Sequence, residues 1–200
     1  MILHGVVMDP AMPVRGLAVA EYDALVAGGV LDDEQLELLE GVLVEMEARS
    51  PEHANLTEEL AHHLTIGLHV AGRRDLVVRQ HSPLSLPPWS EPEPDIAVVE
   101  PARTRPGRHP TSAHLLVEVA FSSRGRDLVR KPRVYATAGI PELWVVDLHA
   151  QETVVHRDPR PEDGAYGEVR RVPWQAELEI LGVAVRLADI VGRPAPDRGP

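Results

Sequence analysis

Two acidic side chains adjoin apolar runs that are typical of buried strands. Asp95 directly precedes IAVV (96–99), and Glu118 lies inside LLVEVAF (115–121). A carboxylate in a buried strand is costly unless it is paired, hydrogen-bonded or bound to a cation. If the two strands are neighbours, the two carboxylates converge and form a site for a hard cation of the Mg²⁺ kind. The alternative is that both acids are only structural, with Asp95 simply starting its strand.

Three polar residues follow the Glu118 strand at helical spacing. Asp127, Lys131 and Tyr135 stand four residues apart, so they can share one helix face. Lys131 could then reach back to the carboxylates and stabilise charge on a phosphate or position a water molecule. The alternative is an ordinary exposed ion pair between Asp127 and Lys131. Pro132 requires that the helix either begins near Lys131 or is kinked there.

The first half of the chain contains the patterns that predict helices. Residues 19–27 carry helix formers and end at a GG pair. Residues 31–46 predict a short helix that ends at Gly41, followed by an edge strand in VLVEM. Residues 50–72 have Ser50 at a cap position and Pro51 in the first turn, and they predict a strong amphipathic helix. Its apolar series is Leu56, Leu60, Leu64 and Leu68.

The middle and later chain predicts a sheet. Short β-rich runs alternate with Pro, Gly and Asp: DLVVRQ, PLSLP, PDIAVV, HLLVEVAF, LWVVDL, ETVVHRD and GEVRRVPW. A helical segment, ended by Gly139 and Pro141, lies between HLLVEVAF and LWVVDL. A strand, helix, strand crossover of this kind favours parallel pairing of the two strands. The fold class is therefore α/β (α+β), with a mixed sheet flanked by helices.

Length and composition indicate one acidic domain. The 200 residues suit a single core, and the absence of cysteine excludes disulfides and thiolate metal sites. The start lacks the features of a signal peptide, and no apolar run approaches the roughly 20 residues of a membrane span. We expect a cytoplasmic protein that does not enter membranes. Its predicted parts are an N-terminal extension (1–16), one domain (17–190) and a disordered tail (191–200) with too little apolar content to pack.

The charge distribution limits the ways in which the chain could bind nucleic acid. The formal net charge is −11 at pH 7, which argues against a broad basic face. Basic residues nevertheless cluster in RTRPGR (103–108) and SRGRDLVRKPR (123–133). Contact with DNA is therefore expected to be local and sensitive to salt.

Several of these segments together resemble one known family. LELLEGVLVEM, SPEHANLTEELAHHL, EPDIAVV and LLVEVAFSSRGRDLVRKPRVYATAGIPELWVVD are similar to the Uma family of putative restriction endonucleases, a branch of the PD-(D/E)XK nuclease-like superfamily. The most specific part is the order E-V-x-x-S, D-x-x-x-K and Y-A-x-A-G-I-P-E-x-W-V-V-D. The resemblance covers residues 17–190. It implies a restriction-endonuclease-like mixed sheet and hydrolysis of DNA phosphodiester bonds at a site holding Mg²⁺ or Mn²⁺.

The resemblance also implies roles for particular residues. Asp95 matches the acid of the PD element, and Glu118 matches the acid of the E-x-K element. Ala120 stands where that element has lysine, so Lys131 on the following helix takes its place. Glu37 matches the acid of an early helix and would bind the metal or orient the site.

Further residues are expected at the border of this site, each with a structural alternative. Glu93 is either a group beside the metal ligands or a loop residue, and His53 either borders the site or only begins its helix. Ser122 either contacts phosphate or caps the next helix. Tyr135 hydrogen-bonds in the site or packs on the sheet. Zinc at His53, His62 and His63 is disfavoured because EEXXHH is not the HEXXH pattern.

Two classes of function therefore remain. The first is a metal-dependent endonuclease, for which a homodimer would suit cutting of both strands. The alternative is a non-catalytic metal- or nucleic-acid-binding or regulatory protein on the same fold, favoured by Ala120, Pro132 and the acidic charge. No phosphate-binding Gly-rich loop or nucleophile elbow is present, so nucleotide-driven chemistry and serine hydrolysis are disfavoured.

Overall fold

The structure is a computed structural model that describes residues 2–3, 6–7, 15–32, 34–46, 48–101, 108–120 and 127–191. Ser122 and residues 192–200 of the predicted tail lie outside the described residues. Of the predicted N-terminal extension, the described strands β1 (Ile2–Leu3) and β2 (Val6–Val7) form a small antiparallel pair.

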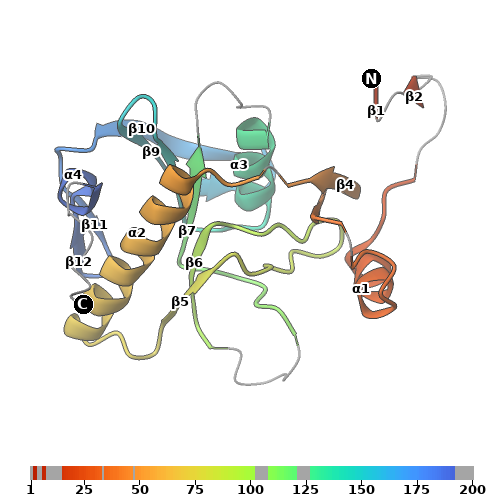
Figure 1. Ribbon diagram of the computed structural model, residues 1–200, viewed down its shortest axis with the longest axis horizontal. Coiled ribbons are helices and arrows are strands. Elements are labelled where there is room, and N and C mark those ends of the chain that lie inside the picture. The colour runs from red at the N-terminus through yellow and green to blue at the C-terminus, as the bar shows by residue number, and fades with distance from the viewer. Residues whose placement is uncertain are drawn as a thin grey trace, which may run out of the picture.

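A six-stranded mixed sheet forms the centre of the domain (Figure 1). Its order is β10-β9-β8-β7-β6-β5, and only β7 and β8 pair in parallel. This parallel pair confirms the predicted crossover. The strands are β5 (Val77–Gln80), β6 (Ile96–Val99), β7 (Leu115–Ala120), β8 (Glu142–Asp147), β9 (Glu152–Arg160) and β10 (Ala165–Pro173).

Besides the β1–β2 pair, four helices and two short hairpins accompany the sheet in the described ranges. The helices are α1 (Val19–Ala27), α2 (Pro51–Val70), α3 (Asp127–Thr137) and α4 (Leu187–Val191). The hairpins are β3 (Leu36–Leu39) with β4 (Val42–Glu45), and β11 (Leu178–Ile180) with β12 (Val183–Val185). No helix in the described residues is long and apolar enough to cross a membrane.

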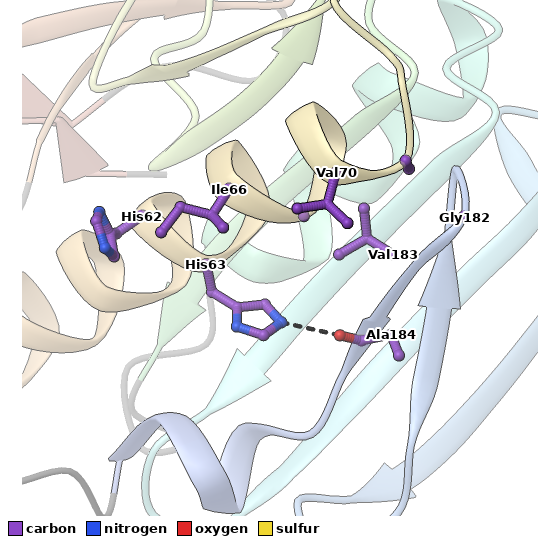
Figure 2. A pocket seen from close by; sticks show the side chains of 9 residues that line it. His62, His63, Ile66, Val70, Gly182, Val183 and Ala184 are labelled. Atoms are coloured by element: carbon purple, nitrogen blue, oxygen red, sulfur yellow. Dashed lines mark hydrogen bonds between the residues drawn. The ribbon is translucent and has the colours of Figure 1, made fainter.

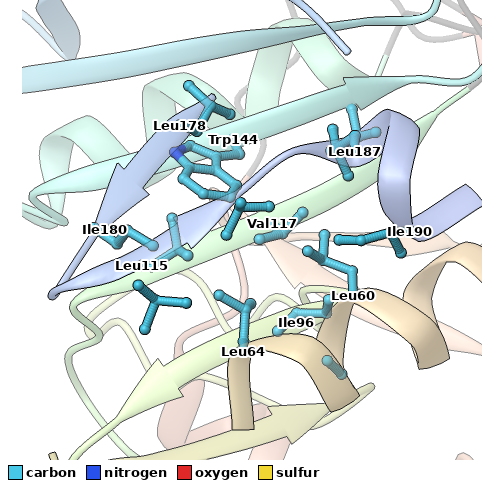
Figure 3. Close-up of a cluster of buried hydrophobic side chains, with 14 of the residues drawn as sticks. Leu60, Leu64, Ile96, Leu115, Val117, Trp144, Leu178, Ile180, Leu187 and Ile190 are labelled. Carbon is cyan, nitrogen blue, oxygen red and sulfur yellow. The ribbon is translucent and has the colours of Figure 1, made fainter. Parts of the chain in front are cut away.

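The central strands bury both of their faces. On one face, Ile96, Val117 and Trp144 pack with the leucines of α2, the β11–β12 hairpin and α4, as Figure 3 shows. On the other face, Leu116 and Leu143 pack against α3. Because successive strand residues point to opposite faces, the near-continuous apolar runs in the sequence supply both cores. Trp144 is fully buried.

Helix α2 follows its sequence signals closely. Ser50 caps it by accepting a hydrogen bond from the backbone N–H of His53 at 3.3 Å, and Pro51 occupies the first turn. The leucines at four-residue spacing are buried on the sheet. Helix α3 begins at Asp127 and continues past Pro132 to Thr137, so the proline does not define its start.

The early helix predicted in residues 31–46 is wrong. Leu36–Leu39 is strand β3, which pairs with β4 through a turn at Glu40 and Gly41. Both turn residues have positive φ (52° and 79°), as a type I′ hairpin turn requires. Glu37 therefore stands on a strand and not on a helix. The following strand, β4, is where the sequence predicts it.

Two further differences separate the sequence pattern from the fold. PLSLP forms no strand apart from an isolated bridge between Leu86 and Ser90, because its prolines lack the N–H groups that a ladder needs. The β11–β12 hairpin and α4 were not predicted. This hairpin turns at Leu181 and Gly182, which have φ values of 56° and 81°, so it repeats the turn chemistry of the first hairpin.

Gly67 lets α2 approach the β11–β12 hairpin closely. A Cβ at position 67 would lie 2.3 Å from Val183 Cγ1, and Val183 is buried. We expect Gly67→Ala to destabilise the fold by about 1–3 kcal/mol in urea denaturation, although alanine is the better helix former. In a double-mutant cycle, Val183→Ala should cost less in the Gly67→Ala chain than in the parent. A Gly67→Ala chain more stable than the parent would contradict this.

Candidate active site

Glu118 lies at the centre of a buried polar cluster between β7 and α3. The Lys131 ammonium approaches both of its carboxylate oxygens at 3.2 Å. The Tyr135 hydroxyl donates a hydrogen bond to Glu118 Oε1 at 2.6 Å. Because Lys131 and Tyr135 are one helical turn apart, the face of α3 that covers the sheet delivers both groups to the same carboxylate. Lys131 is only 8% exposed, so the alternative of an ordinary surface pair does not hold.

Glu37 adds a second carboxylate to the same ammonium. Lys131 Nζ lies 3.1 Å from Glu37 Oε2, which also accepts the backbone N–H of Glu93 at 3.0 Å. Strand β3 is fixed beside this loop by backbone hydrogen bonds between Leu38 and Glu91. The hairpin therefore carries Glu37 into the cluster, the place that the resemblance implied for it, although from a different element.

Strand register brings Asp95 next to Glu118. Strand β6 pairs with β7 through Ile96 and Val117, so Asp95 stands one step further, across from Glu118. The backbone ladder between β6 and β7 ends there. The Asp95 side chain then replaces the backbone acceptor, because its Oδ2 accepts a hydrogen bond from the Val119 N–H at 2.8 Å. The second side of the same oxygen contacts His53 Nε2 at 3.0 Å.

The other oxygen of Asp95 has looser neighbours. His81 Nδ1 lies 3.5 Å from Oδ1, and Arg49 Nε lies 3.8 Å from it. The His81 contact is within ion-pairing distance but does not have the geometry of a hydrogen bond. Within the described residues, Oδ1 therefore lies near the charged Arg49 and the His81 ring but accepts no hydrogen bond, and its lone pairs are available to a further group.

The electrostatics of the cluster favour an additional positive charge. Burial raises the pKa of Glu118 to about 8, with support from the charges on Asp95 and Glu37 and against the attraction of Lys131. Burial opposes ionisation of Lys131 too, but the carboxylates around it outweigh this and raise its pKa, so the ammonium stays charged.

The pKa of Asp95 moves the other way. Burial alone would raise it, but the hydrogen bond and charge of His53, with the Val119 N–H, hold it below its usual value. Asp95 is therefore ionised at neutral pH. Three carboxyl groups thus lie near one ammonium, and the raised pKa of Glu118 means that one of the three retains its proton at neutral pH.

Carboxylate oxygens are the donors that a hard divalent cation takes. In the described ranges, no set of three or more histidine, aspartate and glutamate side chains is arranged to hold a metal ion alone. Mg²⁺ usually takes only one or two carboxylates and completes its shell with water and substrate phosphate. Asp95, whose Oδ1 accepts no hydrogen bond, and Glu118, whose pKa is raised, fit the role of those one or two carboxylate ligands.

The structure gathers most of the residues that the sequence singled out. Those that meet in the cluster are Glu37, His53, Glu93, Asp95, Glu118, Lys131 and Tyr135. Glu93 takes part through its backbone N–H, and burial raises the pKa of its side chain. Asp127 begins α3, but its side chain, like Ser122, lies outside the described part of the chain.

The histidines considered for zinc do not meet. His62 and His63 lie further along α2, beside a pocket of about 530 Å³ between this helix and the β11–β12 hairpin (Figure 2). His63 Nε2 contacts the backbone oxygen of Ala184 at 2.8 Å. None of the acidic residues of the cluster lines this pocket, so it is separate from the candidate site.

Arg49 and His81 were missed by the sequence reasoning. Each directly borders a predicted element: Arg49 precedes the Ser50 cap, and His81 follows the last residue of β5. One signal for Lys131 was also overlooked. It is the only lysine among the 20 lysine and arginine residues of the chain. Because ammonium and guanidinium groups are not interchangeable in a tight carboxylate site, that single exception is informative.

Comparison with known proteins identifies a family and similar solved structures. The Uma2 family model, described as "Putative restriction endonuclease", matches residues 19–188. The crystal structure of a putative nuclease belonging to DUF820 from Anabaena variabilis ATCC 29413 is similar, with a TM-score of 0.63 and 15% sequence identity over 78% of this chain and 89% of that chain. This likeness confirms the predicted nuclease-like fold. No curated protein matches the chain.

Proposed function

Because this chain belongs to the Uma2 family of putative restriction endonucleases, we propose that it hydrolyses phosphodiester bonds of DNA with the help of Mg²⁺ or Mn²⁺. One observation carries the proposal. Glu37, Asp95 and Glu118 come from three separate segments and converge around a buried, charged Lys131. Burying three carboxyl groups and an ammonium together is costly, and active sites are where such a cost is commonly found.

Each residue of the cluster has a distinct task in this proposal. Asp95 and Glu118 would hold the cation, which when bound polarises a phosphate and lowers the pKa of a water molecule. The Val119 N–H and His53 fix the orientation of Asp95, and Tyr135 fixes that of Glu118.

Lys131 supplies a fixed positive charge close to the carboxylates. Its ammonium can donate a hydrogen bond to a phosphate oxygen and stabilise the negative charge that develops during cleavage. Glu37 holds the ammonium from its other side at 3.1 Å. The position of Lys131 on α3 thus replaces the lysine that Ala120 cannot provide.

A second function has a specific observation in its favour. Both oxygens of Glu118 already have donors, Lys131 and Tyr135, so the cluster is partly satisfied without a metal. The corresponding candidate is a protein of the same fold that binds nucleic acid or metal without turnover. It differs from the first candidate in one measurable property, which is metal-dependent strand cleavage.

The test is nicking of supercoiled plasmid at low salt with Mg²⁺, Mn²⁺ or EDTA. We expect metal-dependent nicking by the parent and a loss of at least about 100-fold in Asp95→Ala. Asp75→Ala is the matched control, because Asp75 is exposed and pairs only with Arg73 in the described residues. Undiminished nicking by a folded Asp95→Ala chain would refute the site. Binding of DNA by the parent without nicking would support the second candidate.

A further inference from the structure

The cluster has an inner and an outer layer. The side chains of Glu37, Glu118 and Lys131 are 5–10% exposed. On the other side of Asp95, His53 is 12% exposed, His81 29% and Arg49 38%. Arg49 and His81 therefore mark the side of Asp95 that is nearer to solvent.

Arg49 has unused hydrogen-bonding capacity. Its guanidinium carries five N–H donors, yet it makes no hydrogen bond to any residue that the structure describes. Its contact with Asp95 Oδ1, at 3.8 Å, is an ion pair only. Arg49 also directly precedes the N-terminus of the 20-residue helix α2, whose partial positive charge adds to its own.

His81 is held in a costly conformation beside the same oxygen. Its φ is 46°, in the left-handed region that residues other than glycine seldom adopt. The backbone N–H of His81 donates to the Asp95 carbonyl at 3.2 Å, which fixes the turn. Its ring lies 6.5 Å from the ring of His53, and its Nδ1 has no hydrogen-bond partner among the described residues. Strain and an unsatisfied polar atom at one residue are typical of a functional position.

We propose that Arg49 and His81 bind a phosphate group of the DNA backbone on the solvent side of Asp95. Arg49 supplies a charged, forked set of donors that matches phosphate geometry, and His81 supplies an imidazole N–H. The proposal rests on the proposed function for its ligand, and it adds a substrate subsite outside the acidic cluster. It also gives a position for a local, positively charged contact with DNA on a chain whose net charge is −11.

The test measures binding without cleavage. Anisotropy of a short fluorescein-labelled DNA duplex is titrated in EDTA over a series of salt concentrations. Arg49→Ala should weaken binding about tenfold and lower the salt slope by about 1, as expected for one lost phosphate contact. Arg49→Lys should keep the slope but bind less tightly than the parent. Arg74→Ala is the control, since Arg74 is exposed and precedes β5, at the opposite end of that strand from His81.

His81 allows a test that separates binding from folding. Glycine accepts φ of 46° without strain, so His81→Gly should melt at the same or a higher temperature than the parent while binding DNA more weakly. His81→Asn, which tolerates this conformation and keeps a donor, should retain more affinity than His81→Gly. A purely structural role for His81 would instead lower the melting temperature together with affinity.

The outcomes also separate this inference from the proposed function. Weakened binding by Arg49→Ala, in a parent that binds DNA but does not nick it, would retain the subsite and refute the nuclease. Nicking by the parent with unchanged affinity and slope in Arg49→Ala and His81→Gly would retain the nuclease and refute the subsite. A parent that does not bind DNA even at low salt would also refute the subsite.

Discussion

A Glu118→Gln chain should lose at least about 100-fold in metal-dependent nicking, yet be as stable as the parent or more stable at pH 8. The amide can still accept the hydrogen bond from Tyr135, and Lys131 keeps Glu37 as its partner. What disappears is a carboxyl group whose ionisation is opposed by burial. Activity and stability would thus move in opposite directions, which is the pattern of a site that is costly to keep.

The pH dependence provides the sharper part of this prediction. The pKa of Glu118 is raised to about 8 in the folded chain, against a usual 4.5. The resulting stabilisation is complete below pH 4.5 and is lost as pH rises through about 8. Urea denaturation of the parent should show this loss, on the order of a few kcal/mol, and Glu118→Gln should show a flatter profile. Parallel profiles for the two chains would contradict the assignment.

A Lys131→Met chain should be destabilised by about 3–5 kcal/mol at neutral pH, because it leaves buried carboxylates without their counter-charge. Methionine retains much of the apolar length of the side chain, so the loss reports charge more than volume. Without the ammonium, the folded-state pKa of Glu118 should rise further. Stability should therefore recover as pH falls towards 5 and decline again as pH rises.

Two variants control for the helix and for the charge. Arg130→Met changes an exposed neighbour on α3 and should stay within about 0.5 kcal/mol of the parent. Adding Glu37→Gln and Glu118→Gln to Lys131→Met should restore much of the lost stability, since the buried charges are then removed together. A Lys131→Met chain with parental stability across this pH range would show that the ion pairs contribute little.

The fold was predictable where regularly spaced apolar side chains coincided with clear helix-capping residues. Helix α2 shows this best, since Ser50, Pro51 and leucines at four-residue spacing agree on one structure. The β3–β4 hairpin was not, because LELLEG contains good helix formers and its glycine resembles a helix stop. The signal that distinguishes a hairpin from a helix here was the two-residue turn Glu40–Gly41, which ends in glycine and lies between two short apolar runs. The same signal, Leu181–Gly182, marks the β11–β12 hairpin.

The candidate site was predictable only in part, for a related reason. Spacing along α3 indicated that Lys131 and Tyr135 share a face, and burial indicated that Asp95 and Glu118 need partners. No local pattern could bring Arg49 and His81 to Asp95, because they come from the approach to α2 and the end of β5. Such contacts depend on strand order and on a left-handed turn, which are tertiary properties.

The layered burial of the cluster predicts how a descendant chain would drift if selection for cleavage stopped. Lys131 is the counter-charge that Glu37 and Glu118 share, so losing the lysine alone would impair folding. Arg49 is exposed, and His81 carries strain, so both could be replaced at little or no cost to folding. Replacements should therefore begin at Arg49 and His81 and reach the buried lysine last. In such a lineage, Lys131 would persist after the proposed activity had been lost.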